Sequence, residues 1–194
     1  YSNQMVAAGG YVTTAAYGGT WNELGPKYRS LMQTKLFDPM EMTETTIDFD
    51  EATNRENMAF PHELSIEGDY RQGSLEHEKF ASSVAPAGAV WSSASDMAKY
   101  IQTQLGGGKT PNGTRIVAEE PLTKTWQPQI KVQDAMHYGL GWFHRDFKGK
   151  TVIQHGGGTL GFTSHVAFVP EDELGIVVLT NGAGVSSASL IGER

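Results

Sequence analysis

The chain has 194 residues, of which 39% are hydrophobic and 19% charged, and its formal net charge is −7. This length can bury a sizeable core, and an acidic balance without a long run of like charges argues against the basic surface that nucleic-acid binding needs. No apolar stretch reaches the length of about 18 residues that a membrane span needs. The lack of cysteine excludes disulfides, thiolate catalysis and cysteine-based zinc sites, but it does not indicate a cellular compartment.

Two helices are predicted in the first part of the chain. Residues 4–17 are rich in small and apolar residues and predict a buried helix, weakened by its paired glycines. Thr20 and Glu23 have the spacing of a capping box, and apolar residues then recur at helical intervals. This second helix is expected to run to about Leu36, before Pro39 stops it.

The middle of the chain predicts a long loop and then a third helix. Residues 43–85 are polar and irregular and are expected to cross the surface as a loop that borders a cleft. Ser93 and Asp96 form a second capping-box pattern, and the helix that follows is expected to end at three glycines, residues 106–108. Residues 111–113, Pro-Asn-Gly, predict a turn.

The last part of the chain predicts β-strands. Four segments are rich in β-forming residues: Tyr138–Arg145, Thr151–Gln154, Thr163–Val169 and Leu174–Thr180. Lys148-Gly149 and the acidic segment 170–173 separate them as turns. Such short connections favour an antiparallel meander.

A glycine-rich segment at the end of one predicted strand carries the functional signal. His155 is followed by Gly156, Gly157 and Gly158, and a run of glycines indicates a place where backbone comes close to another group. Bare N–H groups at a strand edge can form an oxyanion hole. From the residues alone, a glycine-rich turn that only connects two strands is about as well supported, and His155 fits a packed polar residue equally well.

The first three residues add a weak signal. In an extended segment Tyr1 and Asn3 project to the same side, so a phenol and a carboxamide would face one cleft. Tyrosine can act as a general acid or base, and asparagine can accept and donate at once. Taken alone, this pattern fits a frayed polar terminus better than a site.

Five segments occur along the chain in an order that is typical of one family. They are Tyr1-Ser2-Asn3, Phe37–Thr43, Pro86–Tyr100, His155-Gly156-Gly157 and Gly175–Asn181. In this order they resemble the serine β-lactamase-related superfamily, in the branch of class C β-lactamases, DD-peptidases, D-aminopeptidases and β-lactamase-like esterases. The resemblance covers nearly the whole chain. It implies an α+β fold of the β-lactamase/transpeptidase type, with an antiparallel sheet flanked by helices.

One departure from the family pattern is decisive. The family's nucleophile lies in a Ser-x-x-Lys motif upstream of Tyr-x-Asn, and no serine in this sequence has that spacing; Ser95 and Lys99 are one residue too far apart. Family members also continue into a C-terminal helix beyond the last predicted strand. We therefore expect a single partial domain, the C-terminal portion of a larger protein. Residues 1–135 should be mainly helix and loop, residues 136–194 should form sheet strands, and the portion alone should be inactive.

The resemblance implies roles for seven residues. The catalytic set is Tyr1, Asn3, His155 and Gly158, and the substrate-binding set is Gly156, Gly157 and Thr159. Tyr1 would share proton transfer with the missing lysine, Asn3 would orient the acyl group, and the Gly158 N–H would hold the oxyanion. The hydroxyl of Thr159 fits an ordinary turn residue better than a substrate contact.

The resemblance implies a serine hydrolase that acts through an acyl-enzyme on an ester, amide or β-lactam carbonyl. Class C β-lactamases have Lys-Thr-Gly where this chain has His155-Gly156-Gly157, so a fixed cation and a hydroxyl are missing and recognition of a β-lactam carboxylate is disfavoured. The alternative is a non-catalytic binding or structural module with the same fold; a plain α+β ligand-binding domain is a third reading.

The expected partners and cofactors follow from the same resemblance. The expected partners are a small-molecule or peptide-like substrate and the missing part of the domain or a covering chain. No metal or organic cofactor is expected, since the six histidines show no metal-ligand spacing. The resemblance is compatible with a periplasmic or secreted protein, but the sequence leaves the location open.

Overall fold

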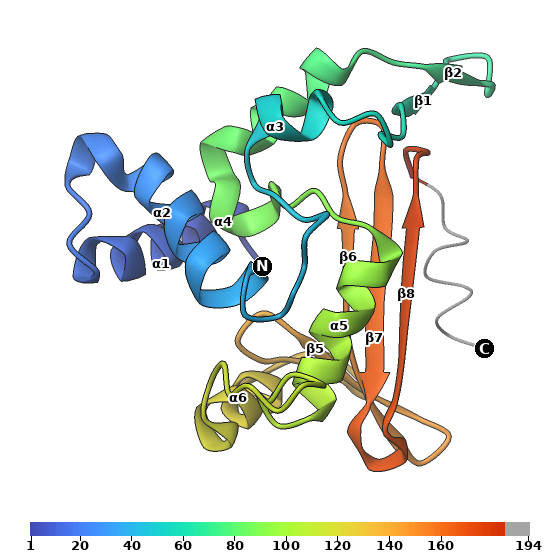
Figure 1. Ribbon diagram of the computed structural model, residues 1–194. Coiled ribbons are helices and arrows are strands. Elements are labelled where there is room, and N and C mark those ends of the chain that lie inside the picture. The colour runs from blue at the N-terminus through green and yellow to red at the C-terminus, as the bar shows by residue number, and fades with distance from the viewer. Residues whose placement is uncertain (185–194) are drawn as a thin grey trace. The chain divides into compact units, whose positions relative to one another are not determined.

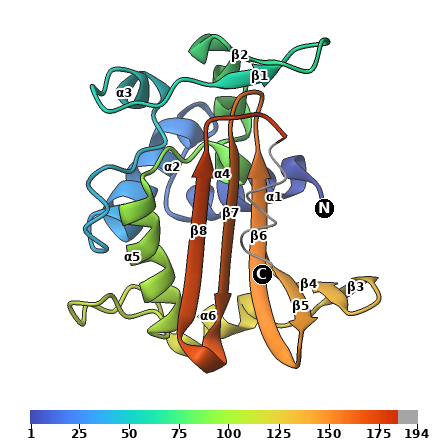
Figure 2. The same cartoon turned by 90° about the vertical axis from the view of Figure 1, so that its right-hand side faces the viewer.

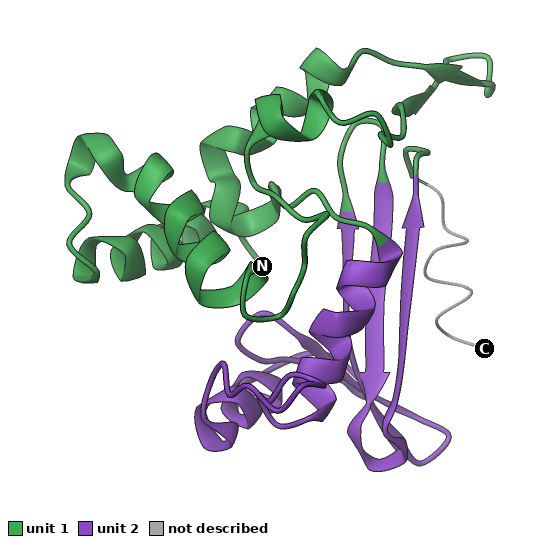
Figure 3. Ribbon diagram, in the orientation of Figure 1, with its two compact units in different colours: residues 1–93, 158–162, 181–184 green, residues 94–157, 163–180, 185–194 purple. Residues whose placement is uncertain are grey.

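The computed structural model describes residues 1–184, which group into two compact units (Figures 1 and 3). Unit 1 holds residues 1–93, 158–162 and 181–184. Unit 2 holds residues 94–157 and 163–180. The last part of the expected sheet region, residues 185–194, lies outside the described residues.

Unit 1 begins with the two predicted helices. The first is α1 (Asn3–Ala16). The second starts as a 3-10 turn at Trp21, continues as α2 (Leu24–Met32) and ends with a π turn at Phe37. Both predictions of helix position are confirmed.

The expected burial of α1 is wrong, because most of its residues are exposed, Met5 and Val12 among them. Ala7 and Thr14 are buried, and Gly10 packs against Pro86 of α4 (Ala85–Gly88) with no room for a Cβ atom between them. These small residues recur at helical spacing and allow close packing on one face. The large exposed residues of α1 and the segment after it are Met5, Val12, Tyr17 and Trp21.

The segment 43–85 contains more regular structure than the predicted loop. Its elements are α3 (Phe49–Thr53), a hairpin of β1 (His62–Leu64) and β2 (Tyr70–Gln72), and a 3-10 helix over Leu75–Val84. Asp48 caps α3 by accepting the N–H of Glu51 at 3.1 Å. These elements are too short to produce a readable hydrophobic period, so the sequence prediction of one irregular loop is wrong here.

Unit 2 is a six-stranded sheet with two helices. Its elements are α5 (Ala94–Leu105), α6 (Glu119–Trp126), β3 (Ile130–Gln133), β4 (Met136–Tyr138), β5 (Phe143–Phe147), β6 (Lys150–Gly158), β7 (Thr163–Val169) and β8 (Leu174–Thr180). The strands are neighbours in sequence order, and Figure 2 shows the three longest side by side. The antiparallel pairs β3/β4, β4/β5, β5/β6 and β7/β8 confirm the predicted meander.

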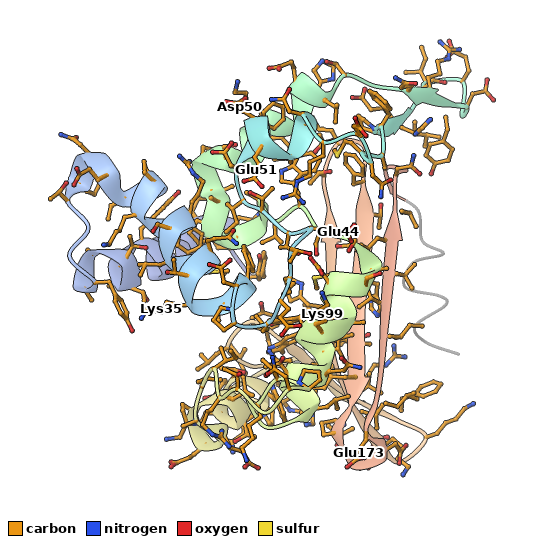
Figure 4. All side chains as sticks on the ribbon, viewed as in Figure 1. Lys35, Glu44, Asp50, Glu51, Lys99 and Glu173 are labelled. Carbon is orange, nitrogen blue, oxygen red and sulfur yellow. The ribbon has the colours of Figure 1, made fainter. Side chains whose placement is uncertain are left out.

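The strand bounds differ from the prediction in three places. The predicted strand over 138–145 is two strands, because a turn at Gly139–Trp142 separates β4 from β5. β3 was not predicted, although its residues alternate between apolar and polar; the alternation spans only four residues, and all four are exposed. β6 continues past Gln154 to Gly158. The turn at Lys148-Gly149 and the one that ends at Glu173, labelled in Figure 4, are confirmed.

The core of unit 2 lies between α5 and the sheet. Ile101 of α5 packs with Trp142, Ile153 and Phe168, all buried. The rings of Trp142 and Phe168 meet edge to face at 5.1 Å between centroids. This cluster fixes β5, β6 and β7 relative to one another, and so it sets the position of the glycine-rich end of β6. No helix within residues 1–184 is both long and apolar enough to cross a membrane.

We expect residues 1–194, produced alone, to self-associate through the apolar outer face of α1, because exposed apolar patches drive association. Met5 and Val12 are 72% and 70% exposed, so changing both to Gln should shift the chain toward monomer and alter its stability little. Size-exclusion chromatography with light scattering measures the first effect and thermal unfolding the second. A monodisperse wild-type monomer with a cooperative unfolding transition would contradict the expectation.

Candidate functional site

The glycine-rich segment is part of a strand and not of a turn. β6 runs through His155 and the three glycines, which are all exposed, and the chain bends only after Gly158. The register of β5 on β6 ends at the pair Phe143 and Gln154, because β5 begins there. The last four residues of β6 therefore extend beyond the β5 pairing. This arrangement leaves an exposed strand edge of the kind that can accept a ligand's backbone.

The three glycines differ in what surrounds them. A Cβ atom at Gly157 would collide with the hydroxyl of Ser164 on β7, so this glycine makes room for that hydroxyl in its present rotamer. A Cβ atom at Gly156 would make only an ordinary contact at 3.8 Å, and at Gly158 it would meet no atom of residues 1–184 within 4 Å. None of the three has a positive φ. The backbone conformation therefore does not explain why Gly156 and Gly158 lack side chains.

His155 is held by its neighbours in unit 2 and is half-buried. Its Nε2 atom lies 3.2 Å from the hydroxyl of Tyr138, and its Nδ1 atom lies 2.6 Å from the carbonyl oxygen of Gly156. The Phe143 ring lies 5.4 Å from the imidazole, between centroids. The sequence did not predict this hydrogen bond, because nothing in the local sequence links Tyr138 on β4 to His155 on β6.

The turn after β6, residues 159–162, is fixed within unit 1. The Gly161 N–H donates to Oε1 of Glu78 at 2.7 Å, and the Gly161 carbonyl accepts the N–H of His62 at 3.2 Å. Glu78 is 2% exposed, and a Cβ atom at Gly161 would collide with Pro61. Glu78 is thus a structural anchor of the segment that begins with Gly158. Sequence reasoning missed it, because it is separated from Gly161 by 83 residues.

Thr159 lies in this turn. Its N–H donates to the carbonyl oxygen of Phe162 at 3.0 Å. Its hydroxyl oxygen is buried and has no hydrogen-bond partner within residues 1–184. A turn hydroxyl ordinarily bonds the nearby backbone, so the structure gives no support for that simpler interpretation of Thr159.

Tyr1 and Asn3 do not have the extended geometry that the sequence predicted. Ser2 is the N-cap of α1 and accepts the N–H of Met5 at 3.4 Å, so Asn3 is already helical. The expectation that Tyr1 and Asn3 project to one side of an extended segment is therefore wrong. Serine is a preferred N-cap, and this signal in the sequence was overlooked. Both residues are exposed.

The candidate residues divide between the two units. Tyr1, Asn3, Gly158 and Thr159 belong to unit 1, and residues 155–157 belong to unit 2. Within each unit the structure defines their surroundings. In residues 1–184 no three His, Cys, Asp or Glu side chains are grouped so that they could hold a metal ion.

Two other tyrosines are unsuited to proton transfer. Burial raises the pKa of Tyr28 to about 12, with a further contribution from Tyr11, and burial also raises the pKa of Tyr100 to about 12. Both phenols therefore stay protonated at neutral pH. Tyr1 is a candidate because of the motif order alone.

Removing the Glu78 carboxylate should loosen the turn that follows β6. Glu78→Ala leaves the buried Gly161 N–H without its acceptor, which should cost about 1–3 kcal/mol of unfolding free energy. Glu78→Gln keeps an acceptor oxygen and should cost less. Urea unfolding measures the cost, and hydrogen exchange at the Gly161 amide localises it. Equal Gly161 exchange in Glu78→Ala and wild type would refute the anchoring role.

Comparisons with known proteins agree on one family. The family model described as Beta-lactamase matches residues 9–191. A Beta-lactamase of Escherichia coli K12 is 28% identical over 198 residues, covering 81% of this chain and 46% of that protein. Penicillin-binding protein 4 of Amycolatopsis lactamdurans is 25% identical over 168 residues, covering 84% and 44%. An unguisins hydrolase of Aspergillus violaceofuscus is 25% identical over 181 residues, covering 84% and 32%. The chain thus spans less than half the length of these three relatives.

Solved structures confirm the fold class. An octameric penicillin-binding protein homologue from Pyrococcus abyssi superposes with a TM-score of 0.69 at 24% identity, covering 86% of this chain and 38% of that one. A mutant class C beta-lactamase superposes with a TM-score of 0.73 at 18% identity, covering 100% of this chain and 56% of that one. The expected mixture of helices and antiparallel sheet is therefore the fold of these proteins, over part of their length.

Proposed function

The chain belongs to the Beta-lactamase family, and we propose on this basis that the protein carrying it is a serine hydrolase that forms an acyl-enzyme with an ester, amide or β-lactam carbonyl. The family match over residues 9–191 carries the proposal. The exposed glycine edge of β6 supports it, because N–H groups at an accessible strand edge can serve as oxyanion donors. The Ser-x-x-Lys motif does not occur in residues 1–194, so the proposal places the nucleophile outside them.

The proposed reaction has two halves. The serine oxygen attacks the carbonyl carbon, its proton passes to the paired lysine and Tyr1, and the resulting tetrahedral intermediate expels the leaving group, which takes up that proton. Water then attacks the acyl-enzyme and releases the acid and the free serine. Asn3 orients the acyl group by donating and accepting hydrogen bonds at once.

The Gly158 N–H is the proposed donor to the oxyanion. Gly158 is the last residue of β6, and no atom of the described residues would meet a Cβ there within 4 Å, so a carbonyl group can approach its backbone closely. The nucleophile's own N–H is the second donor in this proposal. His155, Gly156, Gly157 and Thr159 are the further substrate contacts in this proposal.

The segment His155-Gly156-Gly157 favours neutral acyl substrates over β-lactams. It lacks the fixed cation and the hydroxyl that suit a substrate carboxylate. One relative is named as a hydrolase of unguisins and not as a β-lactamase. A non-catalytic module with the same fold is the alternative, and a Ser-x-x-Lys motif upstream of Tyr1 in the encoded protein discriminates between the two.

Residues 1–194 alone should hydrolyse neither p-nitrophenyl acetate nor nitrocefin above background, because they contain no family nucleophile. They should also take up no covalent label from a fluorophosphonate or a penicillin. Intact-protein mass spectrometry detects such a label directly. Stoichiometric labelling of any serine in this chain would refute the placement of the nucleophile elsewhere.

Tyr1→Phe in the protein as encoded removes one hydroxyl with little change of volume. Turnover should fall by roughly 10²–10⁴, the usual contribution of a positioned acid–base group. KM should change far less, because the phenol acts mainly in the transition state. Steady-state kinetics on a p-nitrophenyl ester measures both constants, with Tyr17→Phe, an exposed tyrosine at the other end of α1, as the matched control. Undiminished turnover would remove Tyr1 from the mechanism.

A further inference from the structure

Three aromatic side chains from three neighbouring strands surround one another at the candidate site. Tyr138 ends β4, Phe143 begins β5, and His155 lies on β6. The rings of Tyr138 and Phe143 are 4.7 Å apart, and those of Tyr138 and His155 are 5.9 Å apart, both edge to face. Tyr138 and Phe143 are also directly paired in the register of β4 on β5. The position of the Tyr138 hydroxyl is therefore set by the sheet.

We propose that Tyr138 is a positioning residue that holds His155 with both ring nitrogens engaged by the protein, so that the proposed site selects acyl groups without a carboxylate. The positioning part rests on the hydrogen bonds alone. The selectivity part rests on the proposed function, in which His155 faces the substrate.

The tautomer of His155 follows from the chemistry of its two partners. The Gly156 carbonyl oxygen can only accept, so Nδ1, which lies 2.6 Å away, carries the hydrogen. A neutral imidazole has one N–H, so Nε2 is then the acceptor, and the Tyr138 hydroxyl donates to it across 3.2 Å. The neutral ring is thereby fixed as the Nδ1–H tautomer.

The same two partners serve the protonated ring. In that state Nε2 also carries a hydrogen, and the Tyr138 oxygen turns from donor to acceptor, as a phenol can. Both N–H groups are then directed at protein oxygens. In neither state is a ring N–H left for a substrate carboxylate, whereas a lysine at this position has three donors. The selection against carboxylates thus depends on the Tyr138 hydroxyl and not only on the absence of lysine.

Nitrogen-15 NMR of the imidazoles tests the positioning step without any substrate. In the protein as encoded, at a pH of about 8.5 where histidine is neutral, His155 should show a protonated Nδ1 and a hydrogen-bonded, unprotonated Nε2. Tyr138→Phe should shift the Nε2 resonance toward the value of a nitrogen that accepts no hydrogen bond.

Tyr100→Phe is the matched control, because its ring stacks on Trp142 in the same unit and not on His155. It should leave the His155 resonances unchanged. A wild-type His155 protonated at Nε2 would overturn the proposal, even if Tyr138→Phe failed to fold. An Nε2 resonance that does not move in a folded Tyr138→Phe would overturn it as well.

A pair of esters with the same chain length tests the selectivity step. Wild type should prefer p-nitrophenyl butyrate to mono-p-nitrophenyl succinate. In Tyr138→Phe the protonated ring has an Nε2–H that is no longer directed at a phenol oxygen and can donate to the succinate carboxylate, so the succinate/butyrate ratio of kcat/KM should rise about tenfold, the usual value of a hydrogen bond to a charged group. An unchanged ratio would overturn the selectivity. If wild type cleaves no ester at all, the proposed function fails, and the NMR result still decides the positioning role.

Discussion

The site depends on a mismatch in length between two adjacent strands. The first residue of β5, Phe143, pairs with Gln154 of β6. β6 continues for four residues beyond that pair, and those four residues are His155 and the three glycines. In the interior of a sheet, the backbone N–H and C=O groups are hydrogen-bonded to the neighbouring strands. Where a strand extends past its partner, those groups on that edge can bond another molecule. The core cluster of Ile101, Trp142, Ile153 and Phe168 maintains this offset, because Trp142 ends the turn before β5 and Ile153 lies on β6 just before the glycine segment. Packing in unit 2 therefore determines where the edge is exposed.

Much of this fold could be predicted from local sequence chemistry. The strands β7 and β8, the turns around them and the helix α5 were readable because apolar period and turn residues agreed. β3 was missed although Ile130–Gln133 alternates between apolar and polar residues; the pattern is only four residues long, and the strand is held by pairing with β4 and not by a buried face. The β-rich composition around Gly141 concealed a turn in which that residue has a φ of 99°. The amino-acid sequence indicates a propensity for β-structure, and here the pairing between strands determines where each strand begins and ends.

Only those residues of the candidate site that are consecutive in the sequence could be predicted. His155 and the glycines could be singled out because they are consecutive, and the order of motifs along the chain gave them a role. The side chains that hold them could not, because Tyr138 and Glu78 come from elements that fold next to the segment from other parts of the chain. Hydrogen bonds of this kind depend on register and burial, which no short sequence window contains.

The glycines between His155 and Phe162 can now be divided by the reason for each. Gly157 makes room for Ser164, and Gly161 makes room for Pro61 beside the carboxylate of Glu78. At Gly156 and Gly158 a Cβ atom would clash with no atom of residues 1–184, and neither glycine has a backbone conformation that requires glycine. Glycine in a strand interior is destabilising, so a position that needs it for neither packing nor conformation carries an uncompensated cost in the protein alone. That cost is understandable if something outside the chain approaches the backbone at these two positions, and in the proposed mechanism it is the substrate carbonyl that does so at Gly158.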